Sequence, residues 1–469
     1  MKKSAAKKPA YLRLLPFYLF LLLAPLAWGD EEAAPPERRV EDRRRDTLRF
    51  GTETEIANLV QTLRSENVSL FDAELIEIAE NTRNRNILSG IFNFFGETEK
   101  SGLEDRAIRA VQERDYEANE AVLAAVDYLG RLNVSQAAPA LKELIMAGEN
   151  RFLTNAIRAL GRAARGQEET ADDAALFLLN YYNNRSPSSE NQREIVDALG
   201  ETGSQEAVPF LIDLIADEED RFVLRMAALN AVSRIGAPQA MEAVVAAVSS
   251  EDPNVRASAI AALGPFSGEA AEEAILDGFR DSFFRSRIGA AQAAGQRRLE
   301  SAVPFLRFRA ENDDVPAVRD EAIRALGAIN NSESMNILNA LFSGRGNSDR
   351  TRLLAAEMLL RNDADTYGVR VAVEMDDAQA RNQTALYNGF IRTLTTARTE
   401  SLEALARRLV TSGGVIERSL ALDLILNNEF RSLANEVRGL LDERRHGVSL
   451  SRKARNTLER LGLEIEADT

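Results

Sequence analysis

Few side chains in this 469-residue sequence are of the types that catalyse reactions or bind metals. The chain has one histidine, His446, and no cysteine, which excludes histidine–cysteine metal sites and a cysteine nucleophile. The adjacent acids Asp376 and Asp377 could provide a general acid and a general base. Neighbouring acids arise by chance among 73 acidic residues, so we expect no catalytic residue, no bound cofactor and no metal site.

Two further features have plain structural interpretations. The stretch SGRGNS at 343–348 contains two glycines but lacks the Lys-Ser/Thr ending with which a P-loop holds phosphate and metal, so we predict a turn. We expect His446 to be a solvated residue at the end of a helix, where the helix dipole favours positive charge.

The residues that recur regularly are structural in type. An arginine returns every 31 to 33 residues, with one gap of 66, and an alanine follows it three residues later. In several central repeats a glycine lies five residues beyond that alanine. Periods in the low thirties are typical of proteins built from stacked supersecondary units. The arginines are Arg225, Arg256, Arg287, Arg319, Arg352 and Arg418.

Each period is expected to form two helices. The chain is 45% hydrophobic but only 6% aromatic, so its apolar residues are mostly small and aliphatic, with many helix-favouring alanines and leucines. One helix carries the arginine. The other, as at 204–217 or 300–312, has a proline in its first turn, where no N–H is needed. Because stacking lets each pair bury its apolar face, we predict an all-α fold, an α-α superhelix of roughly eleven helix pairs.

Alanine and glycine have separate expected roles in the helix that carries the arginine. Offsets −1, +3, +6 and +7 from the arginine share one face, as in Val255, Ala259, Ala262 and Leu263, and this face should pack against neighbouring helices. The glycine that follows is expected to end the helix with a left-handed cap.

Two strings, at 255–264 and 318–327, follow the pattern V-R-x-x-A-x-x-A-L-G. On these residues the chain resembles HEAT-repeat proteins, specifically the short bacterial repeats related to the phycobilisome-lyase type. The resemblance is clearest over 118–361 and weaker over 362–469. Tetratricopeptide repeats are the alternative at this period, but their bulky aromatic signature is missing.

The resemblance also implies a structural ladder between repeats, in which each arginine pairs with an acid of the preceding turn. Arg256 with Asp252 and Arg319 with Asp314 fit this expectation. Leu153 replaces the arginine in an earlier repeat, so the ladder should be incomplete there. Some HEAT-like proteins are iron-dependent hydroxylases with repeated His-Glu pairs, which this sequence lacks.

The N-terminus has the organisation of an export signal. Residues 1–29 contain five basic residues, no acid, an apolar run at 14–26 and small residues at the expected cleavage site, as in a secretory signal peptide. An uncleaved anchor is the alternative, although the run is shorter than the roughly 20 residues of a spanning helix. Residues 30–51 are predicted to be a disordered charged linker, and 52–469 the HEAT-repeat solenoid.

Charge limits the partners that we expect. The net charge is −15, and it would be −20 without residues 1–29. Such a chain repels nucleic acid and anionic membranes, because affinity for both depends on basic residues. We therefore expect protein partners, and this charge would attract a basic partner surface. We expect no nucleic acid, and membrane contact only if the leader is retained.

The concave wall of the solenoid is the candidate partner-binding surface. We expect offsets +1 and +5 from each arginine to face it, forming a groove for an extended peptide or a helix. An ordinary wall without a single site is the alternative. The residues are Met226, Asn230, Ala257, Ala261, Ile288, Gln292, Asp320, Arg324, Leu353 and Glu357.

The function predicted from these features is that of an exported scaffold or adaptor in the bacterial cell envelope, most simply the periplasm, without enzymatic activity. Two alternatives remain open. One is a structural envelope component that assembles with itself, and the other is a lyase-like HEAT protein that binds a small molecule.

Overall fold

The computed structural model describes residues 36–218 and 222–465. These residues form 27 α-helices joined by short turns, and no strand occurs among them. The predicted all-α fold is therefore confirmed. The predicted signal peptide over 1–29 lies outside the described residues.

The chain divides into two compact units, Met1–Glu74 and Leu75–Thr469. In the first, α1 (Pro36–Phe50) packs on α2 (Glu53–Glu66), and the third helix α3 (Asp72–Asn81) begins at its end. Thr52 starts α2 with a capping box, in which its hydroxyl accepts from the backbone N–H of Glu55.

Helix α1 corrects the prediction of a disordered linker over 30–51, which is wrong for residues 36–50. Leu48 is buried, and ion pairs join Arg44 to Glu66 (2.6 Å) and Arg45 to Glu74 (2.9 Å). The charges that suggested a linker therefore have specific partners in the neighbouring helices of this unit.

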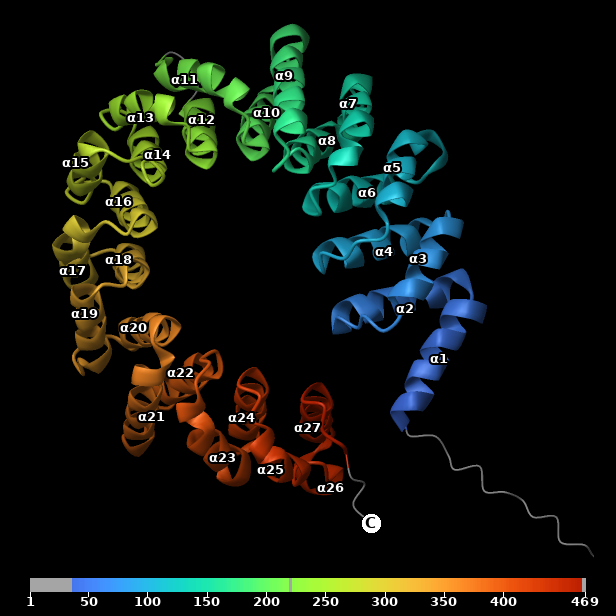
Figure 1. Cartoon of the computed structure of the whole chain (residues 1–469), viewed down its shortest axis with the longest axis vertical. Coiled ribbons are helices and arrows are strands. Elements are labelled where there is room, and N and C mark those ends of the chain that lie inside the picture. Colours follow the sequence, from blue (N-terminus) through green and yellow to red (C-terminus); the bar gives the residue numbers. More distant parts are fainter. Residues whose placement is uncertain (1–35, 219–221, 466–469) are drawn as a thin grey trace, which may run out of the picture. The chain divides into compact units, whose positions relative to one another are not determined.

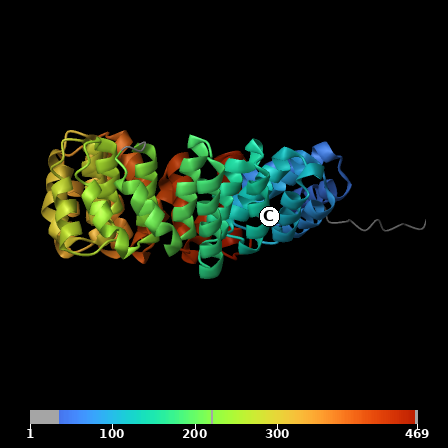
Figure 2. The same ribbon diagram turned by 90° about the horizontal axis from the view of Figure 1, so that it is seen from above.

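In the second unit the helices form an inner and an outer layer (Figure 1). The helices of successive repeats lie side by side (Figure 2). Each inner helix packs against the next inner helix and against its own outer helix. Eleven pairs follow α4, from α5 with α6 to α25 with α27, as the predicted superhelix requires. The inner helices are α4 (Arg85–Glu97), α6 (Asn119–Arg131), α8 (Asn150–Ala163), α10 (Ser189–Thr202), α12 (Phe222–Ile235), α14 (Pro253–Ala262), α16 (Phe284–Arg297), α18 (Pro316–Ile329), α20 (Asp349–Asn362), α22 (Thr384–Thr395), α24 (Val415–Asn427) and α27 (Val448–Arg460).

The outer helices are shorter on average, and several begin with a 3-10 turn followed by proline at the first or second helical position. They are α5 (Glu104–Gln112), α7 (Ala138–Ala147), α9 (Glu168–Arg185), α11 (Val208–Ala216), α13 (Met241–Ala247), α15 (Glu269–Gly278), α17 (Val303–Asn312), α19 (Ser332–Ser343), α21 (Ala364–Ala380), α23 (Glu403–Ser412) and α25 (Ala434–Arg438). The four-residue α26 (Glu443–His446) links α25 to α27.

Inner helices approach one another through a seam of alanine and glycine. The predicted face is buried, with Val255, Ala259, Ala262 and Leu263 all at most 2% exposed. The prediction that the following glycine ends the helix with a left-handed cap was wrong: Gly200, Gly295 and Gly327 lie within helices, and Gly264, which follows the end of α14, does not have a positive φ. A Cβ on Gly200, for example, would lie 2.7 Å from Cα of Ala231, so its absence lets α12 pack directly on α10.

No helix among the described residues is both long enough and apolar enough to cross a membrane.

Candidate partner-binding face and the arginine ladder

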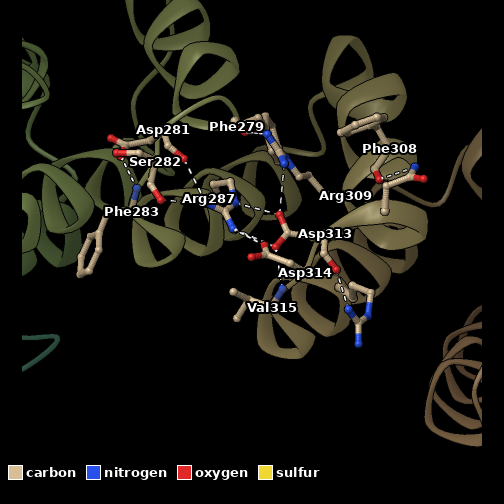
Figure 3. Close-up of polar contacts among 12 residues, drawn as sticks. Phe279, Asp281, Ser282, Phe283, Arg287, Phe308, Arg309, Asp313, Asp314 and Val315 are labelled. Atoms are coloured by element: carbon tan, nitrogen blue, oxygen red, sulfur yellow. Dashed lines mark hydrogen bonds and ion pairs between the residues drawn. The ribbon is translucent and has the colours of Figure 1, made fainter.

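Arg287 shows most fully how the repeats are joined (Figure 3). From the first turn of α16 its guanidinium donates to the carbonyl oxygens of Asp281 and Ser282, both at 3.1 Å. On its other side it donates to both carboxylate oxygens of Asp313, at 2.8 and 2.9 Å, and to Asp314 at 3.2 Å. One side chain thus connects the turn before α16 with the turn before α18.

The same arrangement recurs at Arg256, in the preceding repeat. Arg256 donates to the carbonyl oxygen of Ser250 (2.8 Å) and to the carboxylate of Asp281 (2.7 Å). Arg352 pairs instead with Glu374, which lies within helix α21, at 2.7 Å. Single carbonyl contacts are made by the remaining predicted arginines, namely Arg225 with Ile215, Arg319 with Asp313 and Arg418 with Thr411.

The ladder therefore exists, but the two predicted pairs within it were wrong. Arg256 and Arg287 use the acid of the following turn rather than the preceding one, so Asp314 contacts Arg287 and not Arg319. Asp252 instead caps α14, where it accepts hydrogen bonds from the backbone N–H groups of Asn254 (2.7 Å) and Val255 (3.1 Å). An acid placed directly before a helix satisfies that helix's N–H groups first.

The ladder acids are held in the ionised form. Burial alone would raise the pKa of Asp313, but hydrogen bonds from Arg287 and from the N–H of Val315 outweigh it and lower the pKa overall. The pKa of Asp281 is likewise lowered, because hydrogen bonds from Arg256 and from the N–H of Phe283 exceed the effect of burial.

A buried ion pair near the start of the second unit was missed by the sequence analysis. Arg106 on α5 donates to the carboxylate of Glu117 at 2.7 Å, and both side chains are only 4% exposed. It also donates to the carbonyl oxygen of Ala79. Since Arg106 lies on an outer helix, the spacing of the inner-helix arginines could not reveal it.

The inner face is the surface of the inner helices that points away from the outer layer, and the predicted partner contacts differ in how exposed they are. At offset +5, Asn230, Gln292 and Arg324 are exposed, and Ala261 and Glu357 are half-buried. At offset +1, Met226, Ile288 and Leu353 are half-buried, while Ala257 and Asp320 are buried.

Offset +1 is less exposed because it faces the next inner helix. Asp320 on α18 accepts a hydrogen bond from Arg350 on α20 at 2.7 Å. The carbonyl oxygen of Ala257 lies 2.9 Å from where a Cβ of Gly289 would be, so α16 covers this residue. Ala257 and Asp320 are therefore parts of the stack, and we correct their assignment as partner contacts.

Two offsets that the sequence analysis did not consider reach the inner face instead. Residues at −2 and +9 from the arginine are exposed on most of these helices, because together with +5 they form one stripe along the helix. Extending the heptad-like spacing from +5 in both directions would have found them. They are Val223 and Arg234 on α12, Arg285 and Gln296 on α16, Ala317 and Ala328 on α18, and Arg350 and Arg361 on α20.

The inner face changes character along the chain. From α6 to α10 it is charged, and ion pairs cross between repeats, as from Arg158 on α8 to Glu194 (2.8 Å) and from Arg165, in the turn after α8, to Glu201 (2.6 Å). From α12 to α16 most of its exposed side chains are uncharged, including Asn230 and Gln292. The uncharged stretch is the part of the face where a partner loses least solvation energy on binding.

The residues first considered for catalysis have structural partners. Asp376 accepts two hydrogen bonds from Arg408, and Asp377 lies 3.4 Å from Arg345. The stretch 343–348 forms the predicted turn between α19 and α20. His446 is half-buried rather than solvated, and its Nδ1 lies 3.2 Å from Arg418.

Stacked helix pairs with an arginine ladder define the class of protein as a HEAT-type α-solenoid. A family model described as "Spirochaete HEAT repeat protein" matches residues 48–457. This match covers most of the chain, so the chain belongs to the family of spirochaete HEAT repeat proteins. No curated protein matches the sequence.

Solved structures with a related fold include Kap121p bound to Pho4p, with 12% identity and a TM-score of 0.40 over 89% of this chain and 53% of that one. The karyopherin Kap121p bound to the extreme C-terminus of the phosphatase Cdc14p gives 11% identity, a TM-score of 0.41 and the same coverage. The chain thus spans about half the length of these proteins. Human deoxyhypusine hydroxylase in complex with glycerol gives 19% identity and a TM-score of 0.25, over 60% of this chain and 98% of that one.

Proposed function

We propose that this chain is a non-enzymatic scaffold that holds a protein partner on the inner face of its helices. The observation that carries the proposal is the stripe of exposed side chains at offsets −2, +5 and +9 on α12, α16 and α18, with Asn254 and Ala261 half-buried at the first two of these offsets on α14 between them. Because these helices pack side by side, the stripes together form one continuous surface. A surface built from many repeats is suited to a long segment of protein rather than to a small molecule.

The stretch from α12 to α16 is the proposed centre of this surface. Its exposed and half-buried residues include the side-chain amides of Asn230 and Gln292 and the apolar side chains of Met226 and Ile288. It can therefore offer a partner both hydrogen bonds and apolar contact, and few charged side chains would have to be desolvated. The charged stretches to either side would then set the orientation of the partner.

Site-specific photocrosslinking tests the proposed surface. A benzoylphenylalanine at Gln292 on α16 should crosslink a discrete protein in intact cells, and the same probe at the exposed Asn336 on outer helix α19 should not. With the probe moved to Asn230, the wild-type chain should crosslink the same protein. The double variant Ile288→Arg with Gln292→Glu should abolish this crosslink while leaving the helical content unchanged. Equal crosslinking from Gln292 and Asn336 would remove the inner face as the binding surface.

The proposed site of action is the bacterial cell envelope, in keeping with the basic and apolar character of residues 1–29. A fusion of residues 1–35 to a reporter that is active only outside the cytoplasm should be active. Replacing Leu21, Leu22 and Leu23 with arginine should abolish that activity. Activity retained in the arginine variant, or absent from the unaltered fusion, would contradict export.

A further inference from the structure

The arginine ladder is interrupted at α22, within the gap of 66 residues between Arg352 and Arg418. Each predicted ladder arginine is the fourth residue of its inner helix, in α12, α14, α16, α18, α20 and α24. The fourth residue of α22 is Tyr387. Its hydroxyl donates to a carboxylate oxygen of Glu417, in the first turn of α24, at 2.7 Å. Tyr387 therefore reaches the next repeat, as Arg287 does, but brings no positive charge.

Glu417 is consequently a half-buried carboxylate that has no cationic partner in the described part of the chain. Its second oxygen accepts a hydrogen bond from the backbone N–H of Gly414, the N-cap residue of α24. The adjacent Arg418 donates to the carbonyl oxygen of Thr411 instead. Burial raises the pKa of Tyr387, so its hydroxyl stays a neutral donor and does not cancel the charge of Glu417.

The tyrosine also cannot make the backbone contacts of a ladder arginine. Arg287 donates to the acid of the following turn and to the carbonyl oxygens five and six residues before it. The corresponding carbonyl oxygens before α22 belong to Arg381 and Asn382. A guanidinium has five N–H groups for such contacts, whereas the hydroxyl of Tyr387 has one proton, which it donates to Glu417.

A pocket of about 540 Å³ lies where these contacts are missing, between the turn before α22 and the first turn of α24. Among the described residues that line it, only Glu417 is charged. Val415 and Ile416 give it an apolar wall and are 65% and 64% exposed. The other polar lining side chains are neutral, namely those of Gln379, Asn382, Thr384, Tyr387 and Asn388.

We propose that this pocket binds an arginine side chain from a basic segment of a partner protein, which completes the ladder at the repeat that lacks its own arginine. The guanidinium donates to Glu417, since each oxygen of a carboxylate can accept two hydrogen bonds and each already accepts one. The methylene groups of the arginine lie on Val415 and Ile416.

The charge of the whole chain favours this occupant. A net charge of −15 attracts a basic segment and repels an acidic one. The pocket is separate from the stretch of inner face between α12 and α16, so the proposal does not depend on the partner held there.

Fluorescence polarisation of the full chain with a labelled heptapeptide tests the proposal. The probe has one arginine flanked by leucines in a glycine–serine background, and matched peptides replace the arginine with citrulline or lysine. The arginine peptide should bind saturably. The neutral citrulline peptide should bind about tenfold more weakly, because its hydrogen bonds to the carboxylate lose their charge. The lysine peptide should also bind more weakly, since an ammonium cannot make a bidentate contact.

Variants of the chain locate the binding. Tyr387→Arg supplies the missing arginine from within the chain, so it should abolish peptide binding while the thermal unfolding temperature stays the same or rises. Glu417→Gln should weaken the arginine peptide about tenfold, and it keeps a residue type that serves in a capping box. Glu400→Gln is the matched control, because Glu400 is exposed and does not line the pocket. Circular dichroism should show unchanged helical content in all three.

Four results would overturn the proposal. They are the absence of saturable binding at millimolar peptide, wild-type affinity in a folded Tyr387→Arg variant, equal weakening by Glu400→Gln and Glu417→Gln, and equal affinity for the arginine and citrulline peptides. Equal affinity for the lysine peptide would also contradict it, because the pocket would then attract any cation instead of completing the ladder. If Tyr387→Arg does not fold, Glu417→Gln and its control decide the question.

Discussion

The centre and the C-terminal end of the second unit contain the same arginine but surround it differently. At the centre, Arg287 has a bidentate partner in Asp313, whose side chain is fully buried. At the end, Arg418 occupies the corresponding position, but its neighbour in the following turn is His446, and its Nε has no hydrogen-bond partner among the described residues. The repeat therefore fixes where the arginine lies, and the following turn decides how strongly it joins two repeats.

The largest effect should come from removing the central acid. Asp313→Ala leaves Arg287 without its bidentate partner and removes one contact of Arg309, which should lower the free energy of unfolding by about 3 kcal/mol. Asp314→Ala is the matched control, because Asp314 is 88% exposed and should contribute little. Urea unfolding followed by circular dichroism measures both.

Because a long repeat array need not unfold in one step, hydrogen exchange should locate the loss. Protection should fall in α16 and α18 and stay unchanged in α24 and α27. Uniform loss of protection along the chain would show that the contact between Arg287 and Asp313 does not stabilise its neighbouring helices in particular.

A smaller loss of unfolding free energy should follow from altering the alanine–glycine seam between inner helices instead of an arginine–acid pair. In a helix, Gly→Ala normally stabilises by about 0.5–1 kcal/mol. At Gly200 the new Cβ would meet Ala231 at 2.7 Å, so Gly200→Ala should destabilise by about 1–3 kcal/mol. Gly346→Ala is the control, since nothing lies within 4 Å of its Cβ position. A stabilised Gly200→Ala variant would mean that α10 and α12 can separate at little cost.

Acid should weaken the central rungs in a defined direction. The pKa of Asp313 is lower in the folded chain than its usual value, so its contribution is present above the unfolded pKa near 3.8 and is lost as the pH falls through the lower, folded value. The stability difference between wild type and Asp313→Asn should therefore be constant from pH 7 to about pH 5 and shrink below about pH 4. Urea midpoints measured across this range test the prediction, and a difference that grows on acidification contradicts it.

The smallest effect should be a gain at the C-terminal end. His446→Asp places a carboxylate beside Arg418, as in the central rungs, and should raise the free energy of unfolding by about 0.5–1 kcal/mol. His446→Asn controls for size and polarity without adding charge. Increased protection of α24 and α27 in the aspartate variant alone is the expected result, whereas equal gains in both variants would exclude an ionic rung.

The inner-face residues show where reasoning from sequence reached its limit. The direction of offset +5 follows from helical periodicity, and Gln292 at that offset is exposed. The expectation that offset +1 is exposed was wrong at Asp320, because periodicity describes a single helix and does not say which neighbouring helix packs against it. The pocket beside Tyr387 was not found at all, since its walls at 379–388 and 414–417 belong to different repeats.

The sequence alone determined the repeat length, the all-helical architecture, the buried alanine face and the position of each arginine. All of these depend on the 3.6-residue period and on which residues favour helices, which are local properties of the chain. Only the tertiary structure decided that Arg256 and Arg287 use the following turn, that glycines such as Gly200 allow close packing between helices, and that residues 36–50 form a helix. These outcomes depend on distances between separate repeats, because a side chain bonds to the nearest suitable group in space, whatever its position in the chain.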